Sequence, residues 1–277
     1  MNLTSDLETW PELYGVPSIS RRISIARPPS APFEDSDVLV LSSRSTLPDS
    51  TTVGNLLLYL DLRLSLTITL RSSINQASAG LRYTIPLPES DSSAIARYRW
   101  EHIIDSHGSD EPPDEGTIVK RIKEDGSEEE VEIGLGLDPD TGKIGLYEEI
   151  WKDEPLPAGS AFAFLISDTS PSASKQFMAV VGEHGMVLSH HRHVSPLRAA
   201  RIKYVQNHET DEFEWETTYA IGDFSLEKQL ERVASEMTSR AREGEALWKR
   251  GEIKVVKDRE GGELGRWTGV GRGLHTL

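Results

Sequence analysis

The chain has 277 residues, a hydrophobic fraction of 37% and a formal net charge of −15 at pH 7. Such an acidic protein is a poor partner for nucleic acids or anionic membranes, because phosphate groups need a cationic face. The sequence contains no cysteine, which excludes disulfides, thiolate nucleophiles and thiolate metal sites and suits a reducing compartment. The N-terminus lacks the basic start and apolar core of a signal peptide. We therefore expect a soluble cytoplasmic protein with no membrane span.

The first strong structural signal follows an N-terminal arm expected over residues 1–20. Between 55 and 71, every even position from Leu56 to Leu70 is leucine or isoleucine, and most odd positions are polar. Successive side chains of a strand point to opposite faces, so this alternation predicts a strand with one apolar and one polar face. A strand of this length must bend, bulge or serve two neighbours, as strands do in a barrel.

The rest of the chain is predicted to consist mostly of strands joined by turn sequences, such as those at 124–126 and 138–142. Two acidic runs, 110–115 and 124–132, are expected to be solvated loops. The segment 153–159, DEPLPAG, is rich in Pro and Gly and is the best candidate for a domain boundary.

One helix is predicted at about 225–246, because apolar residues recur there at helical spacing at Leu226, Leu230, Val233 and Met237. The fold class is therefore mainly β, with two consecutive antiparallel barrels at 21–154 and 160–277 and a single helix within the second.

Four fragments of the first half resemble a known family: YLDLRL at 59–64, WEHIIDS at 100–106, DEG at 114–116 and DPDTGKIGLYEEIWKDE at 138–154. They are similar to segments of a fungal family of lipocalin-like proteins, named after a yeast protein that interacts with a casein kinase. The resemblance implies two lipocalin-like barrels but no defined activity. The chain departs from the family at Ile103, Ile104 and the QASAG of 76–80, which suggests a changed pocket.

A barrel of this size can hold one small ligand, and we expect a ligand either in a barrel or between the two barrels. The expected ligand is apolar, of the terpenoid or polyketide class, because leucines line one face of the long strand. Packing against the other barrel would explain the same leucines. The residues assigned to ligand binding are Leu60, Leu62, Trp100, Trp151, Trp215 and Tyr219.

His102 is the leading candidate for a catalytic acid, since an imidazole can donate or accept a proton near neutral pH. Arg63 or Tyr147 would polarise a carbonyl group. Each has a structural alternative: a histidine satisfied by backbone at the barrel rim, an ion pair between Arg63 and Asp61, and packing of Tyr147 between the barrels.

Other constellations do not support a cofactor. His191 and His193 could supply two metal ligands, but the sequence offers no convincing third. The acidic turn at 138–142 has Lys143 where a calcium loop requires Gly. Gly134-x-Gly136 precedes turn residues rather than a helix, so it does not predict a phosphate loop. We therefore predict neither metal nor cofactor.

Two functions remain open from the sequence. One is a cofactor-free fungal enzyme of secondary metabolism that dehydrates and cyclises its substrate, by analogy with the hetero-Diels–Alderases of tropolone–sesquiterpenoid pathways. The other is a non-enzymatic module that binds a protein partner through its acidic loops and helix.

Overall fold

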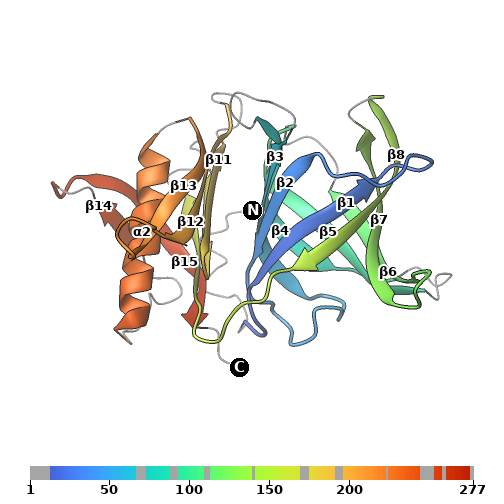
Figure 1. Ribbon diagram of the computed structural model, residues 1–277, viewed down its shortest axis with the longest axis horizontal. Coiled ribbons are helices and arrows are strands. Elements are labelled where there is room, and N and C mark those ends of the chain that lie inside the picture. Colours follow the sequence, from blue (N-terminus) through green and yellow to red (C-terminus); the bar gives the residue numbers. More distant parts are fainter. Residues whose placement is uncertain are drawn as a thin grey trace.

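The computed structural model describes residues 13–66, 73–87, 93–108, 113–138, 141–168, 175–190, 196–222, 224–243, 253–257 and 260–274. Two β units lie side by side (Figure 1), a barrel at the right and a curved sheet with a helix at the left. Three predicted features lie outside the described residues: residues 1–12 of the N-terminal arm, the pair His191 and His193, and the end of the helix at 244–246.

The first unit is a closed barrel of antiparallel strands, each paired with the next along the chain. β1 also pairs with β8, which closes the sheet and leaves no free edge. The strands are β1 (Ser18–Ala26), β2 (Ser36–Ser42), β3 (Leu56–Ser65), β4 (Ile74–Thr84), β5 (Ala94–Asp105), β6 (Asp114–Ile122), β7 (Glu128–Asp138) and β8 (Lys143–Asp153).

The second unit is a seven-stranded sheet in the order β13-β12-β11-β10-β9-β15-β14, curled as a half-barrel. Its strands are β9 (Ala161–Asp168), β10 (Lys175–Val181), β11 (His184–His190), β12 (Arg198–Gln206), β13 (Phe213–Ile221), β14 (Ile253–Lys257) and β15 (Glu263–Leu274). The helix α2 (Phe224–Arg242) packs on this sheet. The predicted fold class of two barrel-type units with a helix is confirmed.

The two faces of the second sheet are buried by different partners. Met178, Val180 and Val187 contact the apolar stripe of α2, which is the predicted one. The residues that alternate with these along β10 and β11 face the barrel. They form a hydrophobic core with residues of the barrel strands β2, β3 and β4. Strands buried on both faces explain the nearly continuous apolar sequences of β10 and β11.

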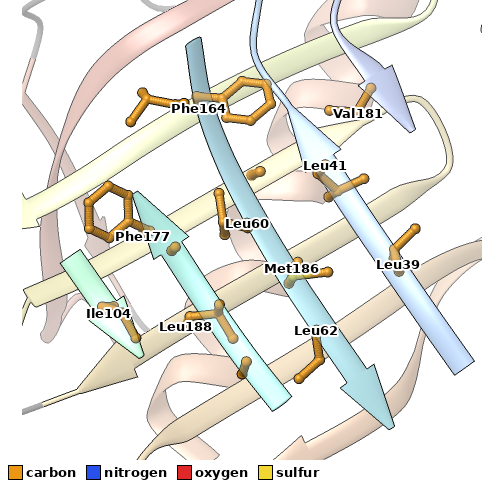
Figure 2. Packing of buried hydrophobic residues seen from close by; sticks show 14 of the residues in the cluster. Leu39, Leu41, Leu60, Leu62, Ile104, Phe164, Phe177, Val181, Met186 and Leu188 are labelled. Atoms are coloured by element: carbon orange, nitrogen blue, oxygen red, sulfur yellow. The ribbon is translucent and has the colours of Figure 1, made fainter. Parts of the chain in front are cut away.

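The leucine face of β3 forms the barrel's side of this contact. Leu60 and Leu62 are 1% and 0% exposed and pack with residues such as Phe177 and Met186 of the second sheet. Figure 2 shows these side chains interleaved between the strands of the two units. Consequently the polar face of β3 points into the barrel.

The first half of β4, which begins at Ile74, packs against the second unit. Small residues allow this: Ala77 and Ala79 are fully buried in the contact between the units. A bulge follows, because Ala79 pairs with Ile104 and Gly80 with His102, leaving an extra residue in β5. A Cβ atom at position 80 would lie 1.9 Å from the Glu101 carbonyl oxygen, so only glycine fits.

An ionic network also joins the units. Arg201 of β12 donates to Asp37 at 2.5 Å, and Arg21 of β1 bridges Asp37 and Glu154 at 3.0 and 2.7 Å. His184 of β11 contacts the same Glu154 at 3.0 Å. Among the described residues, no helix is long and apolar enough to cross a membrane.

Candidate binding site in the first barrel

The barrel encloses a cavity of about 1110 Å³, here called the barrel cavity. Its wall carries many charged and aromatic side chains, and these come from seven of the eight strands. They include Arg22, Tyr59, Asp61, Arg63, Arg82, Tyr98, Trp100, His102, Asp105, Asp114, Glu132, Tyr147, Glu149 and Trp151. A filled apolar barrel is therefore excluded, and the cavity is large enough for a small organic molecule.

Glycines in β6 and β7 make room for two of these side chains. A Cβ atom at Gly134 would lie 2.4 Å from the Tyr147 ring, and one at Gly116 would lie 2.8 Å from the Glu132 carboxyl. The neighbouring Gly136 also faces Tyr147. The Gly134-x-Gly136 pattern thus serves close packing of a tyrosine across the strands.

Three strands contribute a buried ionic network to the cavity wall. Arg63 contacts Asp61 at 2.8 Å and Glu149 at 3.2 Å, and Arg22 contacts the same Glu149 oxygen at 2.6 Å. Arg22 also forms a two-pronged pair with Glu34 at 2.8 and 2.9 Å. Burial opposes the charge of Arg63, but Asp61 and Glu149 hold its pKa well above the usual value. The predicted Asp61–Arg63 ion pair is confirmed.

Glu132 is a buried carboxyl beside this network. The Tyr147 hydroxyl donates to it at 3.2 Å, and its side chain faces Glu149 across the strand pair β7–β8. Burial, and next the negative charge of Glu149, raise the pKa of Glu132 to about 8. Burial also raises the pKa of the Tyr147 hydroxyl. Glu132 is therefore mostly neutral at pH 7 and can give or accept a proton.

His102 lies in a second polar group at the cavity wall. Its Nδ1 donates to Asp105, and its Nε2 lies 3.4 Å from Asp114. The bulge in β5 is what brings His102 and Asp105 to the same side of the strand, since alternation would separate residues three apart. Burial lowers the pKa of His102, but the hydrogen bond to Asp105 and the charge of Asp114 outweigh it, so the pKa is raised.

Of the residues that the sequence assigned to one site, the structure places some on the wall of the barrel cavity and others elsewhere. Trp100, Trp151, His102, Arg63 and Tyr147 all line the barrel cavity, and Tyr147, Glu149 and Trp151 share one face of β8. Ile104 does not share the face of His102: the bulge turns it into the core between the units, where it is 0% exposed.

The other four predicted ligand-binding residues lie elsewhere, and this part of the prediction is corrected. Leu60 and Leu62 pack between the units, as does Tyr219. Trp215 packs beside α2, with its Nε1 donating to Thr238 at 3.3 Å. Apolar alternation in β3 identified a buried face, but that face covers the second sheet rather than the cavity.

The sequence did not identify several charged residues of the cavity wall: Arg22, Arg82, Asp105, Asp114, Glu132 and Glu149. Asp114 and Glu132 were assigned to solvated loops, whereas they lie in β6 and β7, and Glu132 is only 8% exposed. Glu132 and Gly134 alternate with apolar residues in VEIGL, and that alternation was the available signal. Within the described residues, no group of three acidic or histidine side chains is arranged to hold a metal ion.

Together, the fold and the polar cavity define a lipocalin-like β-barrel protein with a charged interior. The profile of the family described as "Protein HRI1" matches residues 18–252, and the chain belongs to that family. A comparison with curated proteins gives no match.

The chain is also similar to a solved structure, the crystal structure of the uncharacterized protein YLR301w of Saccharomyces cerevisiae. The two share 12% identity with a TM-score of 0.60, over 94% of this chain and 100% of the other. At this identity the likeness concerns the fold alone. The resemblance to a fungal barrel family is thereby supported, while the kinase interaction in that family's name stays a prediction.

Proposed function

We propose that the first barrel binds one small organic molecule that carries polar groups. The observation that carries this proposal is the 1110 Å³ cavity with charged side chains on its wall. Burying charges is costly, and a barrel whose interior only had to be filled would use apolar side chains. Fixed charges around an open space are what a polar ligand needs for orientation.

The wall supplies both kinds of contact that such a ligand uses. Trp100, Trp151 and Tyr98 offer aromatic surfaces, and Arg63 lies over the Trp151 ring at 5.9 Å. The Trp151 Nε1 and Asp61 Oδ1 atoms are buried without a hydrogen-bond partner among the described residues. Such groups are uncommon in native proteins and are consistent with a site that a ligand completes. The ligand expected from the structure is therefore amphiphilic rather than purely apolar.

A fragment screen followed by two-dimensional NMR of the indole N–H groups tests the proposal. The chain has six tryptophans, so each indole signal can be assigned by a Trp→Phe variant. Hits should shift the signals of Trp100 and Trp151 together. Trp215 and Trp267 pack near α2 and serve as internal controls. A screen whose hits shift only the control signals, or that gives no hit at millimolar concentration, would contradict the proposal.

A cofactor-free enzyme is the second candidate, and the contact of His102 with Asp105 favours it. A carboxylate that holds the ring and raises its pKa is suited to keep a proton available near neutral pH. Dehydration followed by cyclisation would use His102 as the acid. If substrate is found, His102→Ala should lower turnover by roughly a hundredfold, and a folded variant with wild-type turnover would remove His102 from the mechanism.

A further inference from the structure

Arg82 differs from the other cations of the barrel wall in its surroundings. Arg22, Arg63 and His102 each contact one or more carboxyl groups. Arg82 forms no ion pair or hydrogen bond within the described part of the chain, and its guanidinium lies over the ring of Tyr98 at 4.3 Å from the centroid. A buried arginine normally has a carboxylate or phosphate partner, because its charge is costly to remove from water.

Two carboxyl groups act electrostatically on Arg82, but neither forms an ion pair with it. They are Glu132 and Asp153. Glu132 is mostly neutral at pH 7 for the reasons given above, and Asp153, which accepts a hydrogen bond from the Ser20 hydroxyl at 2.6 Å, forms no ion pair with Arg82. Burial has the larger effect and lowers the pKa of Arg82. The cavity wall therefore contains a cation, Arg82, that forms no ion pair with the described residues.

The strand register surrounds Arg82 with apolar and aromatic residues. Leu57 lies opposite it on β3 and Trp100 opposite it on β5. Tyr98 lies two residues before Trp100 in β5, and its ring, over which the Arg82 guanidinium lies, meets the Trp100 ring edge-on at 6.0 Å between centroids. All four side chains belong to the cavity wall. A molecule bound here would meet one planar cation and a hydrocarbon surface.

We infer that Arg82 binds the carboxylate of a small organic acid whose hydrocarbon or aromatic body rests against Leu57, Tyr98 and Trp100. This inference rests on the proposed function and specifies its ligand class. A planar guanidinium matches a carboxylate through two parallel hydrogen bonds. A monoanion fits better than a phosphate dianion, because Glu149, Asp61 and Asp114 already bring negative charge to the wall.

The test uses two matched pairs of probes: 2-naphthoate with 2-naphthamide, and octanoate with octanamide. Each amide has the shape of its acid without the charge. Calorimetric titration of the full chain at pH 7 should show at least one acid binding tenfold or more tightly than its amide. Arg82→Gln should remove that preference and leave amide binding within threefold, and Arg82→Lys should retain part of it because it keeps the charge but not the planar fork.

Arg97→Gln is the matched control, because Arg97 lies on the neighbouring strand and pairs with Glu115 at 2.6 Å. It should bind both probes like the wild type. Amide binding without a preference for the acid would overturn the role of Arg82 and leave the proposed cavity function intact. Binding of neither pair would overturn both. Should Arg82→Gln fail to fold, the comparison of acid and amide in the wild type decides the question.

Discussion

Replacing Glu132 with glutamine should change how the stability of the protein depends on pH. Glu132 is buried against Tyr147 and Glu149, and its pKa is raised from 4.5 in the unfolded chain to about 8. The folded state therefore keeps a proton that the unfolded state releases above pH 4.5. The contribution of Glu132 to stability is fully present below that pH and is lost as the pH rises towards 8.

The expected size follows from the two pKa values. Each pH unit between them costs about 1.4 kcal/mol for one proton, so the wild type should lose about 2.5 kcal/mol from this group between pH 5 and pH 7. Glutamine has the shape of the neutral carboxyl and can still accept the Tyr147 hydrogen bond. The Glu132→Gln variant should therefore gain stability relative to the wild type as the pH rises.

Urea unfolding followed by tryptophan fluorescence at pH 5, 6, 7 and 8 measures this difference. Glu130→Gln is the control, since Glu130 lies on the same strand with an exposed side chain. Its curve should run parallel to that of the wild type. Parallel curves for Glu132→Gln and wild type would show that Glu132 is already ionised in the folded state, and the argument from burial and Glu149 would be refuted.

Three further outcomes are expected from urea unfolding at pH 7. Arg63→Met should lower the free energy of unfolding by about 3–5 kcal/mol, because it leaves Asp61 buried without its cation and leaves Glu149 with Arg22 alone. Arg82→Met should stay within about 1 kcal/mol of the wild type, and equal losses for the two variants would contradict the difference in pairing. Leu60→Ala should lower the free energy of unfolding by about 2–5 kcal/mol, because it leaves a cavity in the core between the units. A loss below about 1 kcal/mol, as is usual at surface sites, would argue against that packing. Gly80→Ala should destabilise by roughly 3 kcal/mol, since its Cβ would meet the Glu101 carbonyl at 1.9 Å, and a variant as stable as the wild type would refute the close approach at the bulge.

The sequence predicts the strands and the helix well because their signals are local. Alternation in 56–65 marks β3, and the stripe from Leu226 to Met237 marks α2. The sequence does not reveal which face of β3 points into the barrel cavity, because both faces are shielded from solvent. One face is covered by the second sheet and the other lies inside the barrel. The apolar residues on both faces of β10 were a signal that this sheet needs a second partner besides the helix.

The candidate site is predicted only in part, since its geometry depends on contacts between distant strands. His102, Tyr147 and Trp151 stand out as residue types that carry chemistry. The bulge that aligns His102 with Asp105 depends on the approach of Gly80 to β5, which periodicity within one strand does not report. Arg82 has no distinctive motif, and only the closed barrel shows which carboxyl groups fail to reach it.

The most direct test of a ligand-binding barrel is a crystal structure of the protein soaked with the hits of the fragment screen. The proposed function predicts density for a bound molecule inside the first barrel, in contact with Trp100 or Trp151. The inference on ligand class adds that a carboxylate hit should place its charged group at Arg82. Hits bound only outside the barrel, around a cavity that stays unoccupied, would contradict the proposed function.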